Sequence, residues 1–400
     1  IDSQPIMSAC IARLLRALPA IALLSAPLCA APVVAPFFNG VFPAQAPGLT
    51  GWQVVNAFPN LRFADPIWIA QVPGSNDMVV VEKAGRIVGF PKNPAVGTAE
   101  VSVVLDISSL VQTSEDQGLY RIAFHPKFGG SGPHADEVFI SYSHRPAVEG
   151  AAPDKSMWRL SRFTWQAATG TIDPSSEEVL IQQYDPNRWH NGGALDFDND
   201  GFLLVTCGDG GGSNEQLGLV QKLNGGFFGG VLRIDVDRDP ARSHPIRRQP
   251  GSSGKPAGFP ADLSQGYFIP NDNPWQDSSG ALLEEFYALG LRSPHTAHYD
   301  PPTGDLWVGD VGQNLQEELT RVRKGENHQW PYKEGALGGP KGMPSPHYGT
   351  QMPPVYSYGR TTGGCIIGGM RYRGARWSEE LGGTVILGDF RKGGLSAFDP

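Results

Sequence analysis

Cysteine is scarce in this chain, which also lacks a block of basic residues and a long apolar run. Its 400 residues include 4 Cys, with neither a C-x-x-C-H haem site nor a zinc-spaced Cys/His cluster, so a disulfide scaffold and a zinc centre are excluded. The balance of 32 Lys and Arg against 40 Asp and Glu gives a net charge of −8, which argues against nucleic acid as a partner. Walker loops, G-x-S-x-G elbows and strand-to-helix G-x-G-x-x-G turns are absent, which disfavours nucleotide and α/β-hydrolase chemistry.

Glycine and proline are abundant instead. The 51 Gly and 35 Pro make about one residue in five a strong turn former, so long helices cannot dominate. A hydrophobic content of 40% with 10% aromatic residues excludes disorder, and glycine falls far below the one third that collagen requires. We therefore expect a folded protein rich in strands and turns.

The amino end has the pattern of a secretory signal. Two arginines precede an apolar run from Leu18 to Leu28, and small residues follow as far as Ala31. A membrane span is the alternative, but the run is short of the ~20 apolar residues required, and prolines interrupt it. We predict a signal peptide over 1–30, export to the periplasm or the medium, no membrane span after its removal, and a Pro-rich lead-in over 31–51. Two cysteines then remain, Cys207 and Cys365, and the sequence leaves open whether they pair.

A unit of three short strands separated by Gly, Asp or Pro turns recurs along the rest of the chain. Each copy begins with an apolar strand and continues with a strand of alternating apolar residues. Five copies start near Ile67, Tyr120, Gly193, Ser293 and Gly364. Such self-similarity is typical of a β-propeller, whereas a β-sandwich would not explain it. We expect an all-β propeller over 52–400, with its last blade incomplete or missing.

Polar residues that flank the first strand of each unit are the candidates for chemistry. His190 lies in Trp-His-Asn-Gly-Gly before the third unit, and Arg292 lies in Gly-Leu-Arg-Ser-Pro before the fourth. The histidine suits acid–base chemistry and the arginine can bind a carboxylate with its planar fork. A loop-capping histidine and a surface ion pair are the simpler alternatives. Gln117 and Arg391 occupy comparable places in other units.

Two acidic segments could bind a metal. Asp196–Gly201 has the start of a calcium loop, but Cys207 stands where the bidentate Glu belongs, so we interpret it as a strand-to-strand turn. Asp310–Glu318 is the better candidate, because its carboxylates and backbone carbonyls offer the oxygens that calcium prefers. A loop capped by its own side chains is the alternative there.

Seven segments, in order along about 65–398, resemble the soluble pyrroloquinoline-quinone (PQQ)-dependent glucose/sorbosone dehydrogenases, whose propeller is shared with the Hedgehog-interacting-protein group. They include the motifs Gln-Gly-Leu-Tyr-Arg-Ile-Ala-Phe-His-Pro from Gln117, His-Asn-Gly-Gly-Ala from His190, Tyr-Ala-Leu-Gly-Leu-Arg-Ser-Pro from Tyr287 and Asp-Val-Gly-Gln-Asn from Asp310. The resemblance implies a six-bladed propeller that binds PQQ and calcium and oxidises a sugar hydroxyl, usually the anomeric one of an aldose. Electrons would pass to a soluble or membrane acceptor.

The resemblance also implies roles for individual residues. His190 would be the general base and Gln117 the glutamine near the substrate, while Arg292 would bind PQQ carboxylates or stabilise charge on the quinone oxygen. Ser293 stands where the family commonly has Asn beside the cofactor, and Arg391 is a further candidate PQQ ligand. Calcium would be held partly by backbone oxygens of Val311, Gly312 and Gln313 in the Asp310–Glu318 loop, and the candidate ligands are Gly312, Gln313 and Glu318.

Two functions from different classes follow from these observations. The first is an exported PQQ-dependent sugar dehydrogenase. The second is a catalytically silent propeller that binds a protein or a carbohydrate, as in the Hedgehog-interacting-protein group. A calcium-dependent propeller hydrolase is weaker, because it would need a central carboxylate cluster that the motifs do not supply.

Overall fold

The computed structural model describes residues 54–148, 152 and 154–400. The predicted signal peptide over 1–30 and the Pro-rich lead-in over 31–51 lie outside these residues. The helical elements of the described part are the 3₁₀ turn η1 (Thr98–Glu100) and the one-turn helix α1 (Ser378–Leu381). Within the described residues, no helix has the length and apolar character that a bilayer crossing requires.

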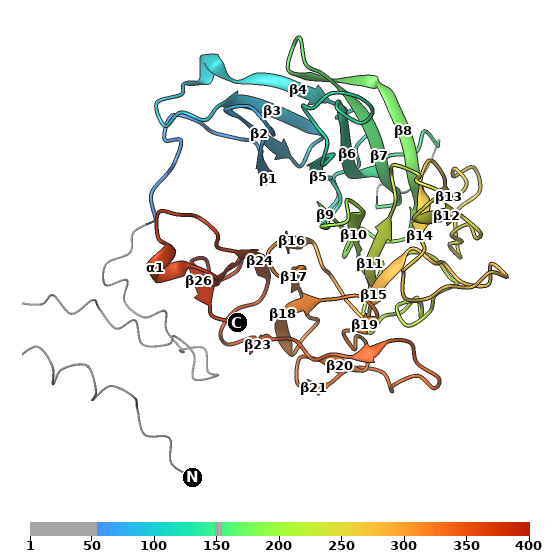
Figure 1. The fold of residues 1–400 in the computed structure, drawn as a ribbon. Coiled ribbons are helices and arrows are strands. Elements are labelled where there is room, and N and C mark those ends of the chain that lie inside the picture. Colours follow the sequence, from blue (N-terminus) through green and yellow to red (C-terminus); the bar gives the residue numbers. More distant parts are fainter. Residues whose placement is uncertain (1–53, 149–151, 153) are drawn as a thin grey trace, which may run out of the picture. The chain divides into compact units, whose positions relative to one another are not determined.

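Five sheets, antiparallel apart from two strand pairings, follow one another along the chain, in agreement with the predicted all-β class (Figure 1). The first contains, from inner to outer edge, β1 (Pro66–Gln71), β2 (Asp77–Glu82), β3 (Arg86–Pro91) and β4 (Ser102–Asp106). The second contains β5 (Leu119–Phe124), β6 (Glu137–His144), β7 (Ser156–Gln166), β8 (Thr171–Asp185) and the short outer β13 (Leu263–Ser264).

Of the other three sheets, the fourth and fifth have the same up-and-down order, whereas the two outermost pairings of the third are parallel. The third contains β9 (Gly192–Phe197), β10 (Leu203–Cys207), β11 (Gly230–Ile234), β15 (Phe286–Leu289), β19 (Glu326–Asn327) and β22 (Thr350–Gln351). The fourth contains β16 (Thr296–Asp300), β17 (Asp305–Asp310), β18 (Gln316–Val322) and β23 (Tyr356–Gly359). The fifth contains β24 (Ile366–Arg371), β25 (Val385–Asp389) and β26 (Leu395–Phe398). Two small ribbons complete the fold: β12 (Ser243–Pro245) with β14 (Phe268–Pro270), and β20 (Lys333–Glu334) with β21 (Leu337–Gly338).

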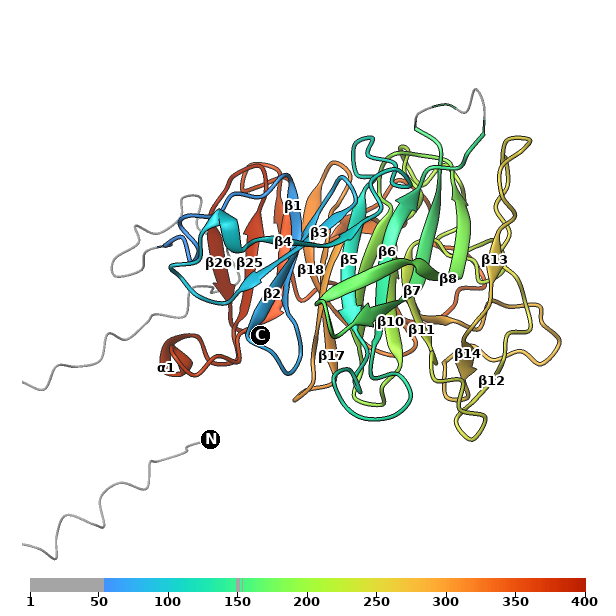
Figure 2. The same ribbon diagram turned by 90° about the horizontal axis from the view of Figure 1, so that it is seen from above.

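Successive sheets pack face to face, as propeller blades do. The inner strands β1, β5, β9, β16 and β24 contact one another in chain order and surround a common axis (Figure 1). Figure 2, seen from above, shows the strands of successive sheets standing side by side. Neighbouring residues of one strand point to opposite faces, so Val138 joins the core between the first two sheets while Phe139 joins the next core. Alternating apolar residues thus bury both faces of each inner sheet.

The five sheets begin where the five predicted units begin, but most of them have an outer strand that the sequence did not reveal. The long β8 is the clearest case, because its middle residues Ser175 to Val179 are mostly polar and half-buried or exposed. The outer faces of the end sheets also expose apolar side chains. These are Ile67, Ile69 and Val103 on the first sheet and Met370 and Leu395 on the fifth.

Candidate active site

The predicted site residues lie at one end of the inner strands. Gln117 precedes β5, His190 precedes β9 and Arg292 precedes β16, while Arg391 follows β25 at the end where β24 begins. Because these inner strands contact each other in chain order, their first residues share one rim around the axis. The repeat architecture therefore gathers side chains that are far apart in the sequence.

His190 is held at both its backbone and its ring. Its φ of 59° is left-handed, and its backbone N–H donates to Asp116 Oδ2 at 2.9 Å. Ring atom Nδ1 lies 2.7 Å from Oδ1 of Asp209, a fully buried residue. Because a carboxylate oxygen accepts, Nδ1 carries the proton, which leaves Nε2 with a free lone pair. A Cβ on Gly208 would lie 1.8 Å from the His190 carbonyl oxygen, so this close approach requires glycine.

Asp209, which the sequence did not single out, connects His190 to Arg292. Its Oδ1 also accepts from the Gly211 N–H at 2.9 Å, and its Oδ2 accepts from the Trp330 indole N–H at 3.0 Å. Its own N–H donates to the Arg292 carbonyl at 2.8 Å. The Trp330 ring centroid lies 5.4 Å from the Arg292 guanidinium carbon. His190 and Arg292 thus lie on either side of one carboxylate and one indole.

The guanidinium of Arg292 binds the loop predicted to hold calcium. Nη1 donates to the carbonyl oxygens of Val311 and Gly312, at 2.8 and 2.7 Å. The Gln313 side chain exchanges hydrogen bonds with Asn214, accepting from its N–H at 2.6 Å and donating to its Oδ1 at 2.8 Å. Glu318 accepts from the Gly335 N–H at 2.5 Å. The Gly312 carbonyl and one side-chain oxygen each of Gln313 and Glu318 are therefore already bound by a protein donor.

Two buried acids lie opposite each other beneath this loop. Asp310 of β17 pairs in register with Glu318 of β18. Burial raises the pKa of Asp310 to about 7, and burial together with the nearby Asp310 raises the pKa of Glu318 well above its usual range. Asp310 accepts backbone N–H bonds from Arg292 and Ser293, at 2.9 and 2.6 Å. Asp310 thus holds the backbone of the segment before β16 that carries the arginine.

The other predicted ligands differ in their exposure. Gln117 is fully buried, and its amide donates to Ser156 Oγ at 3.0 Å, while its Oε1 has no partner among the residues that the structure describes. Ser293 is buried. Arg391 is exposed, and its side chain lies against Gly364. Of this set, Arg391 alone offers its side chain to a ligand at the surface.

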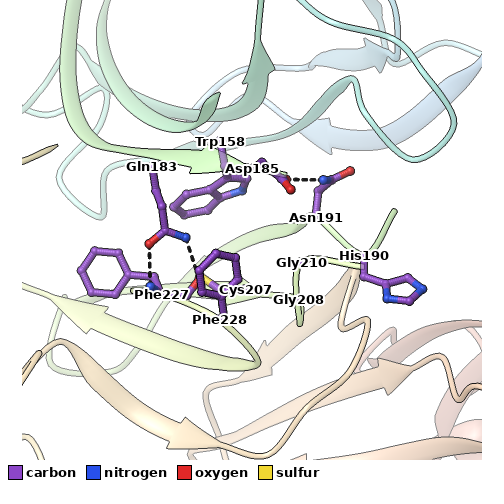
Figure 3. A pocket seen from close by; sticks show the side chains of 10 residues that line it. All are labelled: Trp158, Gln183, Asp185, His190, Asn191, Cys207, Gly208, Gly210, Phe227 and Phe228. Atoms are coloured by element: carbon purple, nitrogen blue, oxygen red, sulfur yellow. Dashed lines mark hydrogen bonds between the residues drawn. The ribbon is translucent and has the colours of Figure 1, made fainter. Parts of the chain in front are cut away.

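A small cavity lies behind His190. It encloses about 10 Å³, room for roughly one water molecule, and is lined by residues that include Trp158, Asp185, Asn191 and Cys207. Figure 3 shows the imidazole of His190 pointing away from the other lining side chains. Burial raises the pKa of Asp185 to about 7.

Cys207 and Cys365 are both free, so no disulfide joins them.

The acidic turn Asp196–Gly201 is neutralised by an arginine. Arg233, with 3% of its side chain exposed, contacts Asp198 and Asp272 at 2.6 Å each and Asp200 at 2.8 Å. A cation of the protein thus occupies the place that a calcium ion would take. This arrangement supports the turn interpretation.

A cluster of His125, His134 and Asp237 lies at the other end of β5. Their candidate metal-ligand atoms lie within 4.8 Å of one another. Nδ1 of His125 accepts the Lys127 N–H at 3.1 Å, so its proton lies on Nε2 and faces Asp237 Oδ1 at 2.8 Å. The Lys127 ammonium also binds Asp237, at 2.6 Å. These contacts describe an ion-paired cluster that needs no metal.

Comparison with known proteins identifies the family of this chain. The chain matches the Glucose / Sorbosone dehydrogenase family over residues 63–256 and 261–399. It belongs to this family. The predicted resemblance is thereby confirmed.

Relatives of this glucose/sorbosone dehydrogenase homologue fall into two groups. The chain is 25% identical to HIPL1 protein of Arabidopsis thaliana over 66% of its length, and 26% identical to Hedgehog-interacting protein of Mus musculus over 79%. It is 26% identical to quinoprotein glucose dehydrogenase B of Acinetobacter calcoaceticus over 65%. These matches cover 40%, 39% and 49% of the respective relatives. The chain therefore corresponds to part of each relative.

A solved structure supports the fold. The apo-form of the soluble aldose sugar dehydrogenase from Escherichia coli superposes with a TM-score of 0.58 at 18% identity, covering 84% of this chain and 86% of that one. At this identity the match supports the fold alone. It agrees with the face-to-face packing of the sheets.

Proposed function

We propose that this chain is an exported quinoprotein dehydrogenase that oxidises the hydroxyl of an aldose or a related sugar, with His190 as the general base. The observation that carries the proposal is the bond from His190 Nδ1 to the buried Asp209 at 2.7 Å. A general base must present an unprotonated atom and keep its orientation during proton transfer. Asp209 provides both, because it fixes the Nδ1–H tautomer and the plane of the ring.

The chemistry divides between cofactor and protein. PQQ, when bound, accepts the hydride that leaves the sugar carbon. Nε2 of His190 takes the hydroxyl proton as the C–O bond becomes a carbonyl, and Asp209 stabilises the imidazolium that results. Trp330 and Gly211 hold Asp209 in place through their N–H groups. The proton would thus go to His190 and the hydride to the cofactor.

PQQ carries carboxylates, so its site requires cations. Arg292 and Arg391 lie at the same rim, and among the described residues Arg391 has no carboxylate within ion-pair distance. These two arginines would hold the cofactor at the open rim. The residues present therefore fit PQQ. They do not fit calcium, because the loop oxygens are bound by donors of the protein.

We also propose that the complete ring has six blades. Support comes from Ile67 and Ile69 of β1, with 47% and 44% exposure, and from Leu395 of β26 with 65%. A further sheet between the first and the fifth would bury them, since an unpaired apolar sheet face is unfavourable in water. This chain alone should bind the apolar dye anilinonaphthalene sulfonate, and Ile69→Ser with Leu395→Ser should weaken the binding. Unchanged dye binding would contradict a sheet at this place.

Export remains a proposal that rests on the predicted signal peptide over 1–30. Amino-terminal sequencing of the protein recovered from outside the cytoplasm is the test. A mature chain that begins near Ala31 is expected. Recovery of the uncleaved chain in the cytoplasm alone would refute it.

The enzyme proposal is tested by adding PQQ to the purified chain and measuring dye reduction with a panel of aldoses. His190→Ala should lower kcat by ~10²–10⁴-fold, the usual effect of removing a general base. The exposed His347 supplies the matched control, since His347→Ala should leave kcat unchanged. Absence of PQQ binding at micromolar concentration would refute the dehydrogenase.

That result would favour the second candidate, a propeller that binds a protein or carbohydrate without catalysis. The specific observation in its favour is the similarity to Hedgehog-interacting protein, which covers more of this chain than the match to the bacterial dehydrogenase. Under this candidate, Asp209 and His190 stabilise the loop before β9. His190→Ala would then lower the melting temperature without changing any redox activity.

A further inference from the structure

We infer that in this chain the guanidinium of Arg292 supplies the positive charge at the Val311–Gly312 carbonyl pair, so that the site works without calcium. Both carbonyl oxygens accept from one nitrogen, Nη1, at 2.8 and 2.7 Å. These are the backbone oxygens at which the family resemblance places the metal. The inference concerns the rim of the proposed active site, but it does not depend on sugar oxidation.

The ion and the guanidinium exclude each other by geometry. Calcium lies ~2.3–2.6 Å from each oxygen ligand. On the side of the carbonyl pair that faces Arg292, an ion at that distance from both oxygens would overlap Nη1, which is itself under 3 Å from each. Calcium could enter only if Arg292 moved away. The side chain would then lose two charge-assisted hydrogen bonds and its place beside the Trp330 ring.

The loop also lacks the further oxygens that calcium needs. Calcium takes ~6–8 oxygen ligands. Asp310 is engaged by the backbone N–H groups of Arg292 and Ser293, and Oε1 of Glu334 accepts three N–H bonds from residues 314–316. The side-chain oxygen of Gln313 accepts from Asn214. Every one of these oxygens has a protein donor.

The backbone of the loop is fixed in this form. A Cβ on Gly312 would lie 1.7 Å from the Gln316 carbonyl oxygen and 2.8 Å from Glu334 Oε1. The turn is therefore closed tightly around the Glu334 carboxylate. The Val311 and Gly312 carbonyls of this closed turn both face Nη1 of Arg292.

Terbium luminescence on the cofactor-free chain tests the inference. Terbium replaces calcium at oxygen sites and emits when a nearby indole is excited, and the Trp330 ring lies 5.4 Å from the guanidinium carbon of Arg292, which binds the carbonyl pair. We expect the wild-type chain to show no emission that depends on Trp330, so Trp330→Phe should leave its signal unchanged. Arg292→Ala frees the carbonyls next to the buried Asp310 and should gain a several-fold emission, which excess calcium quenches and Trp330→Phe abolishes.

Arg292→Lys is the second variant, because it keeps a cation at the site and should fold even where the alanine variant does not. It should show no emission dependent on Trp330. Calcium-quenchable, Trp330-dependent emission from the wild-type chain would overturn the inference. Since no cofactor or sugar is present, this result is independent of whether the chain proves to be a dehydrogenase.

Discussion

Replacing Asp209 by Asn tests whether His190 is held in one tautomer by a buried charge. The substitution keeps the size of the side chain but removes the charge opposite Nδ1, at an N–O distance of 2.7 Å. A hydrogen bond to a charged group contributes ~1.5–3 kcal/mol. If that amount is lost as the imidazolium forms, kcat should fall by ~10- to ~150-fold, since ~1.4 kcal/mol corresponds to tenfold in rate.

The KM for sugar should stay nearly constant. Asp209 is fully buried, and its carboxylate contacts His190, Gly211 and Trp330, so it acts through the histidine without touching the substrate. The assay is dye reduction by the PQQ-loaded chain with kcat and KM determined separately. Nitrogen NMR of the cofactor-free protein gives a second readout, because it reports directly whether Nδ1 of His190 carries the proton.

Trp330→Phe serves as the graded control for this experiment. It removes the indole N–H bond to the Asp209 carboxylate but leaves the charge opposite Nδ1 of His190, so a smaller loss in kcat than for Asp209→Asn is expected. Melting temperatures of all variants must show that they fold. A folded Asp209→Asn variant with a wild-type kcat, beside an inactive His190→Ala variant, would refute the positioning role of Asp209.

Three further predictions concern stability. Arg233→Ala should lower the free energy of unfolding by ~3–5 kcal/mol in urea titrations, because it leaves Asp198, Asp200 and Asp272 without their shared cation; a loss under ~1 kcal/mol would contradict this. Gly208→Ala should lower the free energy of unfolding by ~1–3 kcal/mol or more, because its Cβ would lie 1.8 Å from the His190 carbonyl oxygen. Gly338→Ala is the control: a Cβ there has no atom within 4 Å, so the free energy of unfolding should not change in the same titration. Asp185 has a pKa of about 7 in the folded chain against ~3.9 unfolded, so the folded state binds more protons and this group lowers stability as the pH rises from about 4 to 7. Asp185→Asn removes this negative contribution. The slope of the unfolding free energy against pH, measured at pH 5, 6 and 7, should therefore become more positive by roughly 1 kcal/mol per pH unit, and an unchanged slope would refute the assignment.

Much of the fold could be predicted because its signals are local. Alternating apolar residues and Gly-rich turns mark the inner and middle strands of each sheet, and their recurrence indicates a repeat architecture. The outer strands gave weaker signals, since a strand such as β8 is half exposed and its sequence is correspondingly mixed. The position of His190 and Arg292 before inner strands was also visible, because the turn residues fix where each strand begins.

The sequence by itself determined the class of the fold, the number of repeated sheets in the described chain and the side chains that flank the inner strands. Local periodicity decides which face of a strand is buried. Only the tertiary structure decided what these side chains meet: Trp330 reaches Asp209 across 121 positions, and Arg292 binds carbonyl oxygens that the loop motif alone offered to a metal. Such contacts depend on how neighbouring sheets pack, and no pattern within one segment encodes the distance between two of them.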